Sequence, residues 1–288
     1  MMRLRWMPAA ALSAALALPA YVALAASTVT VPVEMQDGRP VVSLKIAGKS
    51  HPFLLDTGSN TALHLTPDLL AKVPGLKLTG RKLHTRDLSG QEQEADEFVI
   101  PDLVLNGVHF GEVRGQAFKP WGLHLGEPLP QPEDKFSVIG LPLFAKQAFV
   151  YDYSARQFSF GAKVQHGGLW KVLPYEASKE GLVVRFVNPR TSYRLVLDSA
   201  STISVVSRQR AEEKNDETGT CPMNIGPGRG CNYVEAGLGD DGISFQPLLH
   251  DLPEQFTADG IAGADFFQHY AVYIDQAAGQ VAVRRKDR

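Results

Sequence analysis

The sequence is poor in cysteine, since only Cys221 and Cys231 occur among its 288 residues. No histidine or second cysteine pair accompanies them at metal-ligand spacing, so a zinc site is disfavoured. Two cysteines this close in the chain can be joined by a disulfide where the compartment is oxidising. We expect that disulfide, with two free thiols as the alternative.

An excess of charge of one sign is lacking as well. The chain carries 29 Lys and Arg against 31 Asp and Glu, a formal net charge of -2, with no block of like charges. This balance disfavours a nucleic-acid surface and a polybasic membrane patch. The histidines show no HExxH-like spacing, and no G-x-S-x-G motif occurs. A zinc peptidase and a serine hydrolase of that type are therefore disfavoured.

Long hydrophobic runs are missing except near the start, where an Ala- and Leu-rich stretch extends from Pro8 to Leu24. Two arginines precede this stretch, and Ala23-Leu24-Ala25 ends it in a small-x-small pattern. These features predict a secretory signal peptide over residues 1–25 and an exported protein, either periplasmic or extracellular, with no membrane contact after cleavage. An uncleaved anchor helix is the alternative, but the run is short for a bilayer and contains Pro19.

What the sequence does contain is a repeated motif. PFLLDTGSNTALHL surrounds Asp56, and YRLVLDSASTISVV surrounds Asp198. In each copy an apolar strand ends at the aspartate, a tight turn of small residues follows, and a second apolar strand begins. Further strand candidates precede the two copies, from Pro40 to Ile46 and from Gly181 to Val187.

The two halves also end alike. The first reads SVIGLPLFAKQAFVYDYSARQFSF and the second DGIAGADFFQHYAVYIDQAAGQVAV. In both halves an aspartate lies twelve residues after a glycine, Gly140 or Gly263, and the small residues after that aspartate predict a hairpin. We therefore expect two homologous β-rich lobes, 26–164 and 165–288. The few helix candidates are short: Pro67 to Val73, Leu141 to Lys146 and Arg208 to Asn215.

The repeated turn has a chemical consequence. An apolar strand that ends in Asp56 holds a carboxylate at the edge of a dry core, and Gly58 permits a sharp turn beside it. Approximate two-fold symmetry would place Asp198 opposite, where two close carboxyls cannot both ionise and share one proton. One carboxylate can then act as general base on a water while the other, protonated, acts as general acid on a carbonyl.

The motifs resemble the paired signatures of pepsin-like aspartic peptidases, on the strength of FLLDTGSN with a later VIG and LVLDSAST with a later IAG. The resemblance covers nearly the whole chain after residue 25. It implies an all-β, bilobal pepsin-like fold of two β-barrel-like lobes with the active-site cleft between them. It also implies hydrolysis of a polypeptide substrate by Asp56 and Asp198, without metal or organic cofactor. Because one chain holds both lobes, we expect a monomer.

The resemblance assigns supporting roles as well. Thr57 and Ser199 would make hydroxyl contacts between the lobes beneath the dyad. The hydroxyls of Ser59 and Ser201 would donate to the outer carboxylate oxygens. Donors of this kind favour the charged form, so they predict lowered pKa values for the dyad and an acidic pH optimum.

Two positions depart from the family pattern. Ala200 stands where the family has glycine, which is harmless unless the backbone needs a positive φ, where alanine costs about 1–2 kcal/mol. The expected flap hairpin, about Leu83 to Glu94, has no tyrosine and is closer to the flaps of retroviral-type peptidases. Both departures leave open an alternative, a peptidase-like protein that binds extended peptides with weak or no catalysis. The expected flap tip consists of Asp87, Leu88, Ser89 and Gly90.

Overall fold

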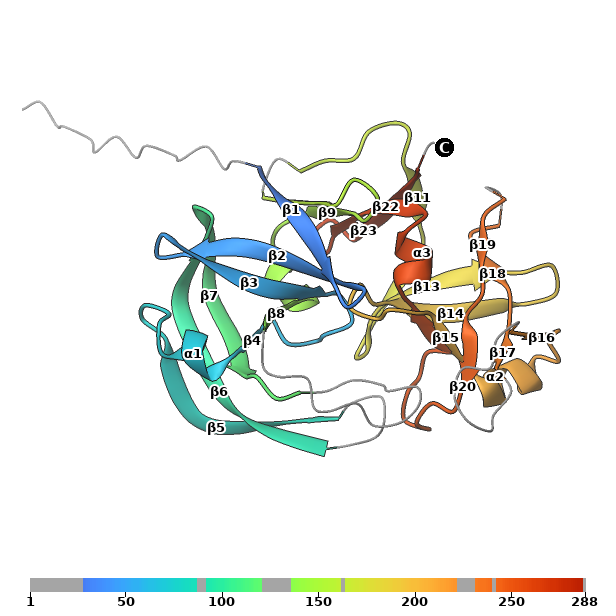
Figure 1. Cartoon of the computed structure of the whole chain (residues 1–288), viewed down its shortest axis with the longest axis horizontal. Helices are drawn as coiled ribbons and strands as arrows, with labels where there is room; N and C mark the ends of the chain where they lie inside the picture. Colours follow the sequence, from blue (N-terminus) through green and yellow to red (C-terminus); the bar gives the residue numbers. More distant parts are fainter. Residues whose placement is uncertain are drawn as a thin grey trace, which may run out of the picture.

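The structure, a computed structural model, describes residues 28–86, 92–120, 136–161, 164–221, 231–239 and 242–286 and shows a mostly β, bilobal molecule (Figure 1). The predicted signal peptide, 1–25, lies outside the described residues. So does the predicted flap tip, Asp87, Leu88, Ser89 and Gly90, although the two strands that lead to it are described. Within the described ranges no helix is long and apolar enough to cross a membrane.

The first lobe, blue to green in Figure 1, is built from strands whose side chains alternate between core and solvent. β3 differs, because it lies between β2 and β8 and its last four residues are all buried. The elements of this half are β1 (Val29–Gln36), β2 (Arg39–Ile46), β3 (Lys49–Asp56), β4 (Leu63–Leu65), α1 (Pro67–Leu70), β5 (Lys77–Arg86), β6 (Glu92–Leu105), β7 (Val108–Ala117), β8 (Ser137–Gly140), the 3-10 helix η1 (Leu141–Phe144), β9 (Phe149–Asp152) and β10 (Gln157–Phe160).

The second half of the chain contributes a second sheet, yellow to red in Figure 1, and part of the first. Its elements are β11 (Lys171–Leu173), β12 (Tyr175–Ser178), β13 (Gly181–Val187), β14 (Ser192–Leu197), β15 (Val205–Ser207), α2 (Arg208–Glu213), β16 (Gly219–Thr220), β17 (Asn232–Tyr233), β18 (Ala236–Gly237), β19 (Ser244–Phe245), β20 (Leu248–His250), β21 (Gly260–Ala262), α3 (Ala264–Phe267), β22 (Tyr270–Asp275) and β23 (Gln280–Arg285).

The internal repeat is visible in the strand order of the two sheets. The first sheet contains β3-β8-β4-β7, and the second contains β14-β21-β15-β20. In both series the first pair is parallel, the second antiparallel and the third parallel. In each lobe, therefore, a short strand lies between the two strands that flank the aspartate turn.

The predicted hairpins at the ends of the halves are present. β9 pairs with β10 and β22 with β23, and Asp152 and Asp275 each accept a backbone N–H three residues on, at 2.9 Å. β22 also pairs antiparallel with β9, so the two hairpins share one sheet that joins the lobes. Strands from both sides of the predicted boundary at residues 164 and 165 thus meet in this sheet, and the boundary itself stays a prediction.

The predicted helices form, but they are shorter than expected, and α3 was not predicted. The repeat contained the signal for it, since α3 follows Gly263 as η1 follows Gly140. Phe144 and Phe267, which occupy matching positions, are both 1% exposed. Each short helix therefore anchors aromatic side chains in the core of its half.

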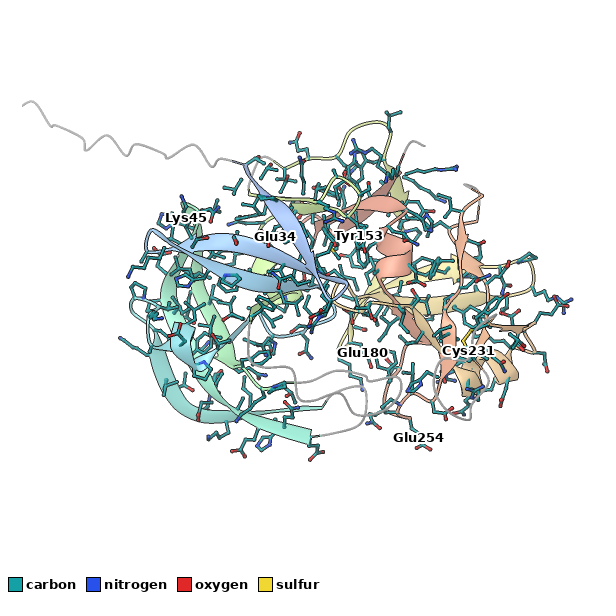
Figure 2. All side chains as sticks on the ribbon, viewed as in Figure 1. Glu34, Lys45, Tyr153, Glu180, Cys231 and Glu254 are labelled. Carbon is teal, nitrogen blue, oxygen red and sulfur yellow. A yellow bond between two sulfur atoms is a disulfide. The ribbon has the colours of Figure 1, made fainter. Side chains whose placement is uncertain are left out.

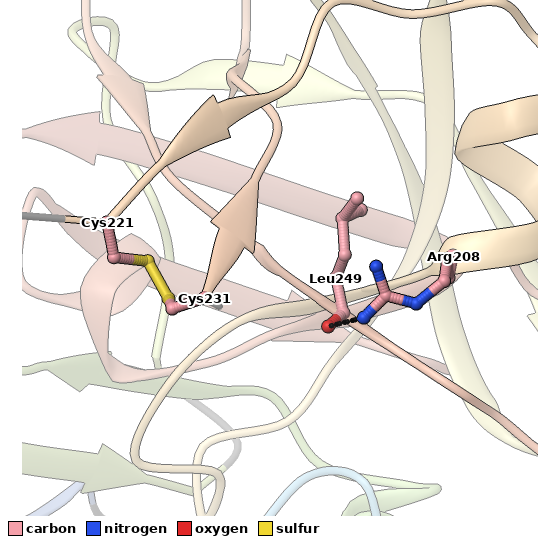
Figure 3. Close-up of a disulfide and its surroundings, with 4 residues drawn as sticks. All are labelled: Arg208, Cys221, Cys231 and Leu249. Carbon is pink, nitrogen blue, oxygen red and sulfur yellow. Dashed lines mark hydrogen bonds between the residues drawn. A yellow bond between two sulfur atoms is a disulfide. The ribbon is translucent and has the colours of Figure 1, made fainter. Parts of the chain in front are cut away.

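The expected disulfide between Cys221 and Cys231 is present (Figure 3). Cys221 follows β16 and Cys231 precedes β17, and the backbone N–H of Cys221 also donates to the carbonyl of Cys231 at 2.8 Å. The disulfide therefore closes the end of a short antiparallel pair at the edge of the second sheet.

Candidate active site

Two matching strands deliver the two aspartates to the junction between the lobes. β3 ends at Asp56, and Asp198 directly follows β14. Beside each strand runs a short parallel strand, β8 with VIG or β21 with the first two residues of IAG. Asp56 lies opposite Gly140 and Leu197 opposite Ala262 in register. Pairing with this short strand fixes the end of β3 and of β14, and therefore the position of each carboxyl group.

The glycine that ends each apolar triplet is required by close backbone packing. A Cβ added to Gly140 would lie 2.0 Å from the carbonyl oxygen of Thr61, and one added to Gly263 would lie 2.5 Å from that of Ile203. The backbone there donates back to the turn region, from Gly140 N–H to the carbonyl of Ala62 at 3.0 Å. No side chain fits at either glycine without displacing the aspartate turn.

The carboxyl groups of Asp56 and Asp198 are hydrogen-bonded to each other. Asp56 is only 5% exposed. Gly58 makes room for this contact, because a Cβ at that position would lie 2.6 Å from Cγ of Asp198. Two contacting carboxyls form a hydrogen bond only when one of them holds a proton, so the pair is a one-proton unit.

Burial raises the pKa of Asp56 well above its ordinary value of 3.8, and the adjacent charge of Asp198 raises that pKa further. Burial also raises the pKa of Asp198, although the hydrogen bond from Asp56 lowers it. Backbone donors oppose these shifts, since two N–H groups reach Oδ1 of each aspartate at 2.9–3.0 Å. The donors belong to Gly58, Ser59, Ala200 and Ser201. Because the two carboxyls titrate together, the single proton belongs to the pair.

Thr57 and Ser199 link the two turns beneath the carboxyls. Thr57 Oγ1 donates to the carbonyl of Leu197 at 2.7 Å and accepts the Ser199 N–H at 3.0 Å. Ser199 Oγ donates to the carbonyl of Leu55 at 2.8 Å and accepts the Thr57 N–H at 3.1 Å. Both side chains are 2% exposed. The four bonds hold the two strand ends at a fixed separation.

The predicted role of the Ser59 and Ser201 hydroxyls was wrong. Ser201 Oγ donates to the carbonyl of Ile203 at 2.7 Å, and Ser59 Oγ lies 3.3 Å from the carbonyl of Thr61. The backbone N–H groups of the two serines bind the carboxylates instead, because the tight turn directs them at Oδ1 and directs the hydroxyls at carbonyls two residues further on. The acidic shift that was predicted from hydroxyl donors therefore loses its basis.

Ala200 causes no backbone strain. It is not among the non-glycine residues with a positive φ, so the methyl group meets no left-handed conformation at this turn. Its N–H donates to Oδ1 of Asp198 at 2.9 Å, as Gly58 donates to Asp56 at 3.0 Å. The departure from the family pattern thus leaves the hydrogen bonding of the second turn intact.

A second contact between the lobes lies beside the first turn. Asn60 Nδ2 donates to the carbonyl of Lys179 at 3.2 Å, in the loop between β12 and β13. The neighbouring Glu180, labelled in Figure 2, accepts from both the N–H and the hydroxyl of Thr257 at 3.0 Å. The loop that reaches across to the Asp56 turn is therefore itself fixed to the second lobe.

The motif analysis missed two polar residues behind the first turn, His64 and Gln116, which are 4% and 2% exposed. The repeat contained a signal for one of them, because His64 interrupts an apolar run at the position where the second copy has Val206. Within the described ranges, no group of three or more His, Cys, Asp or Glu could hold a metal ion. A cavity of about 810 Å³ adjoins the first turn but is lined by neither aspartate.

Comparisons with known proteins agree on the fold. No family model matches the chain, and no curated protein matches its sequence. Solved structures do match. The chain is similar to the basic 7S globulin from soybean, with a TM-score of 0.57 and 13% identity over 90% of this chain and 95% of that one. It is similar to conglutin gamma, a basic 7S globulin from lupine seeds, with a TM-score of 0.57 and 12% identity over 90% and 95%.

The chain is also similar to the aspartic proteinase from Irpex lacteus, with a TM-score of 0.57 and 12% identity over 91% of this chain and 98% of that one. Identities this low establish a shared fold and leave the activity open. The chain therefore has the bilobal, mostly β fold of the pepsin-like aspartic proteinases.

Proposed function

We propose that the protein is an aspartic endopeptidase that hydrolyses peptide bonds with a water activated by Asp56 and Asp198. The observation that supports this proposal is the contact between two carboxyls, the buried Asp56 and the half-buried Asp198, one from each repeat turn. Burying a carboxyl beside a like group costs stability unless the two share a proton. A shared proton supplies one general acid and one general base at the same place.

In the proposed reaction, the ionised Asp198 takes a proton from a water held between the carboxyls. The resulting hydroxyl attacks the peptide carbonyl carbon, while Asp56 gives its proton to the carbonyl oxygen. The C–N bond of the tetrahedral gem-diol then breaks while one of its hydroxyls returns a proton to Asp56. The proton on Asp198 goes to the leaving nitrogen, which restores the one-proton pair. Thr57 and Ser199 keep the two carboxyls in register through this exchange.

Cleavage of a denatured protein mixture from acidic to neutral pH tests this proposal. The wild type is expected to produce fragments, and Asp56→Asn or Asp198→Asn is expected to lower the rate about a hundredfold or more, since each removes one partner of the acid–base pair. Asp68→Asn, at an exposed position on α1, is the matched control and keeps full activity. Cleavage that persists in Asp56→Asn would rule out the dyad.

The alternative is a protein that binds extended peptides without cleaving them. Its support is that two of the structures with this fold are described as basic 7S globulins. The same assay separates the two functions. A binding protein would retain peptides from the mixture in their intact form, and Asp56→Asn would leave that retention unchanged.

We also propose that the chain is exported, with residues 1–25 as a cleaved signal peptide. The disulfide supports this proposal, because such bonds persist mainly in oxidising compartments. N-terminal sequencing of the protein from a producing cell tests it, and Ala26 is the expected first residue. Sizing of the same material tests the proposed monomer.

A further inference from the structure

A buried polar pair lies behind the Asp56 turn. His64 on β4 and Gln116 on β7 stand opposite each other in the parallel register, and both are almost fully buried. His64 Nε2 lies 2.8 Å from Ser59 Oγ, and His64 Nδ1 lies 3.1 Å from Gln116 Nε2. The N–H of Ser59 in turn donates to Oδ1 of Asp56 at 3.0 Å. A chain of polar contacts thus connects Asp56 with the interior of the first lobe.

The second lobe fills the same place with apolar side chains. Val206, like His64, lies eight residues after its aspartate, and it stands opposite Leu249 in the parallel pair of β15 and β20. Val206 is 0% and Leu249 is 9% exposed. Figure 3 shows Leu249, whose carbonyl accepts a bond from Arg208 at 3.3 Å. Packing of a lobe therefore does not require polar side chains at these two positions.

The polar pair is also costly to bury. Gln116 Oε1 has no hydrogen-bond partner within the described part of the chain. A buried polar atom without a partner destabilises the fold, whereas an apolar pair of similar shape does not. The fold does not need His64 and Gln116 for packing, and burying them lowers stability. This combination points to a role at the adjacent Asp56 turn.

The ring of His64 acts in its neutral form. Burial lowers its pKa to about 3, so it carries no charge at higher pH. Because Nε2 of Gln116 is a donor, Nδ1 of His64 accepts, and the ring proton lies on Nε2. His64 therefore donates to Ser59 Oγ, which is left to donate its own proton to the carbonyl of Thr61. The side chain of Ser59 is thereby fixed from two sides.

We infer that His64, held in place by Gln116, is a positioning residue that keeps the N–H of Ser59 directed at the carboxyl of Asp56. This inference rests on the proposed peptidase function, in which Asp56 delivers a proton. Only the first lobe has this polar pair, so the proposed device acts on Asp56 and has no counterpart at Asp198. In this arrangement His64 acts through Ser59.

The double variant His64→Val with Gln116→Leu tests the inference, because it gives the first lobe the apolar pair of the second. His64→Val alone should lower the unfolding temperature, since it deprives Gln116 of its partner, and the double variant should regain part of that loss. The double variant should nevertheless show kcat reduced about tenfold or more, with KM unchanged. His64→Gln, which retains a donor, should recover part of kcat. Val206→Ile, a packing change at the matching site, should leave kcat unchanged.

A second readout keeps the positioning role separate from the proposed activity. Carboxyl ¹³C titration should show the pKa of Asp56 higher in the double variant than in the wild type, because the Ser59 N–H donor lowers that pKa. A folded double variant with wild-type kcat and an unchanged titration would overturn the inference. If the wild type itself shows no cleavage that depends on Asp56, the proposed function fails, and the titration alone decides whether His64 positions the turn.

Discussion

The middle residue of the aspartate turn differs between the lobes, with Gly58 in the first and Ala200 in the second. We therefore expect the substitutions Gly58→Ala and Ala200→Gly to have different effects on kcat. Gly58→Ala should lower kcat about a hundredfold, because its Cβ would lie 2.6 Å from Cγ of Asp198 and push the carboxyls apart. Ala200→Gly should retain activity, since glycine adopts any conformation that alanine adopts. Steady-state kinetics of the pair checks this, and equal losses in both variants would contradict the geometry.

The titration of Asp56 predicts how stability depends on pH. Its pKa is raised in the folded state, so the folded protein binds this proton more tightly than the unfolded chain. The stabilisation is fully present below about pH 4, near the ordinary value, and is lost as the pH rises through the raised pKa. Asp56→Asn has no carboxyl to titrate at this position, so it does not lose this stabilisation as the pH rises. The unfolding temperature of the variant should therefore increase relative to that of the wild type as the pH rises.

Thermal unfolding of wild type and Asp56→Asn across a pH series measures this difference, with Asp68→Asn as an exposed control. A difference that stays constant with pH would show that the pKa of Asp56 is not raised in the folded protein.

At the scale of single residues, the sequence indicated which side chains gather at the site but not how they point. The repeat brought Asp56 and Asp198 to matching positions, which the structure joins. The hydroxyl of Ser59 was predicted to face a carboxylate and instead lies 2.8 Å from His64. A hydroxyl direction depends on the rotamer and on acceptors from distant strands, and no local pattern specifies either.

Between elements, the strand ends at Asp56 and Asp198 are joined by the hydroxyls of Thr57 and Ser199. Thr57→Val preserves shape but leaves the carbonyl of Leu197 and the N–H of Ser199 without their partner. We expect the free energy of unfolding to fall by about 1–3 kcal/mol for each backbone group that loses its hydrogen-bond partner. Denaturant unfolding measures the loss. Thr202→Val, at an exposed position next to the second turn, is the control, and an equal effect there would contradict the account.

The elements themselves followed from the pattern of the sequence to a large extent. The strand predicted from Gly181 to Val187 forms with those bounds, and both terminal hairpins form. The pairing of β22 with β9 was not predicted, because contacts between strands far apart in the chain leave no trace in local periodicity. Helix α3 was missed because four residues are too few for an amphipathic pattern to show.

Across the whole molecule, the disulfide should contribute to stability without affecting catalysis. It joins the ends of β16 and β17, and neither strand carries an aspartate. Replacing Cys221 and Cys231 by serine should lower the free energy of unfolding by about 3 kcal/mol, through the entropy of a short closed loop. Activity at a temperature well below unfolding should stay at the wild-type level. A loss of kcat in the folded double-serine protein would place the disulfide closer to the chemistry than its strands indicate.

Each lobe supplies one carboxyl, Asp56 or Asp198, to the pair. The central claim is that this pair is catalytic only when it holds a single proton. The dependence of kcat/KM on pH tests this claim most directly. We predict a bell-shaped profile that reports the pair and not either aspartate alone, with both limbs above the ordinary aspartate pKa of 3.8, because burial raises the pKa of both groups. A profile with a single limb would contradict the shared-proton dyad.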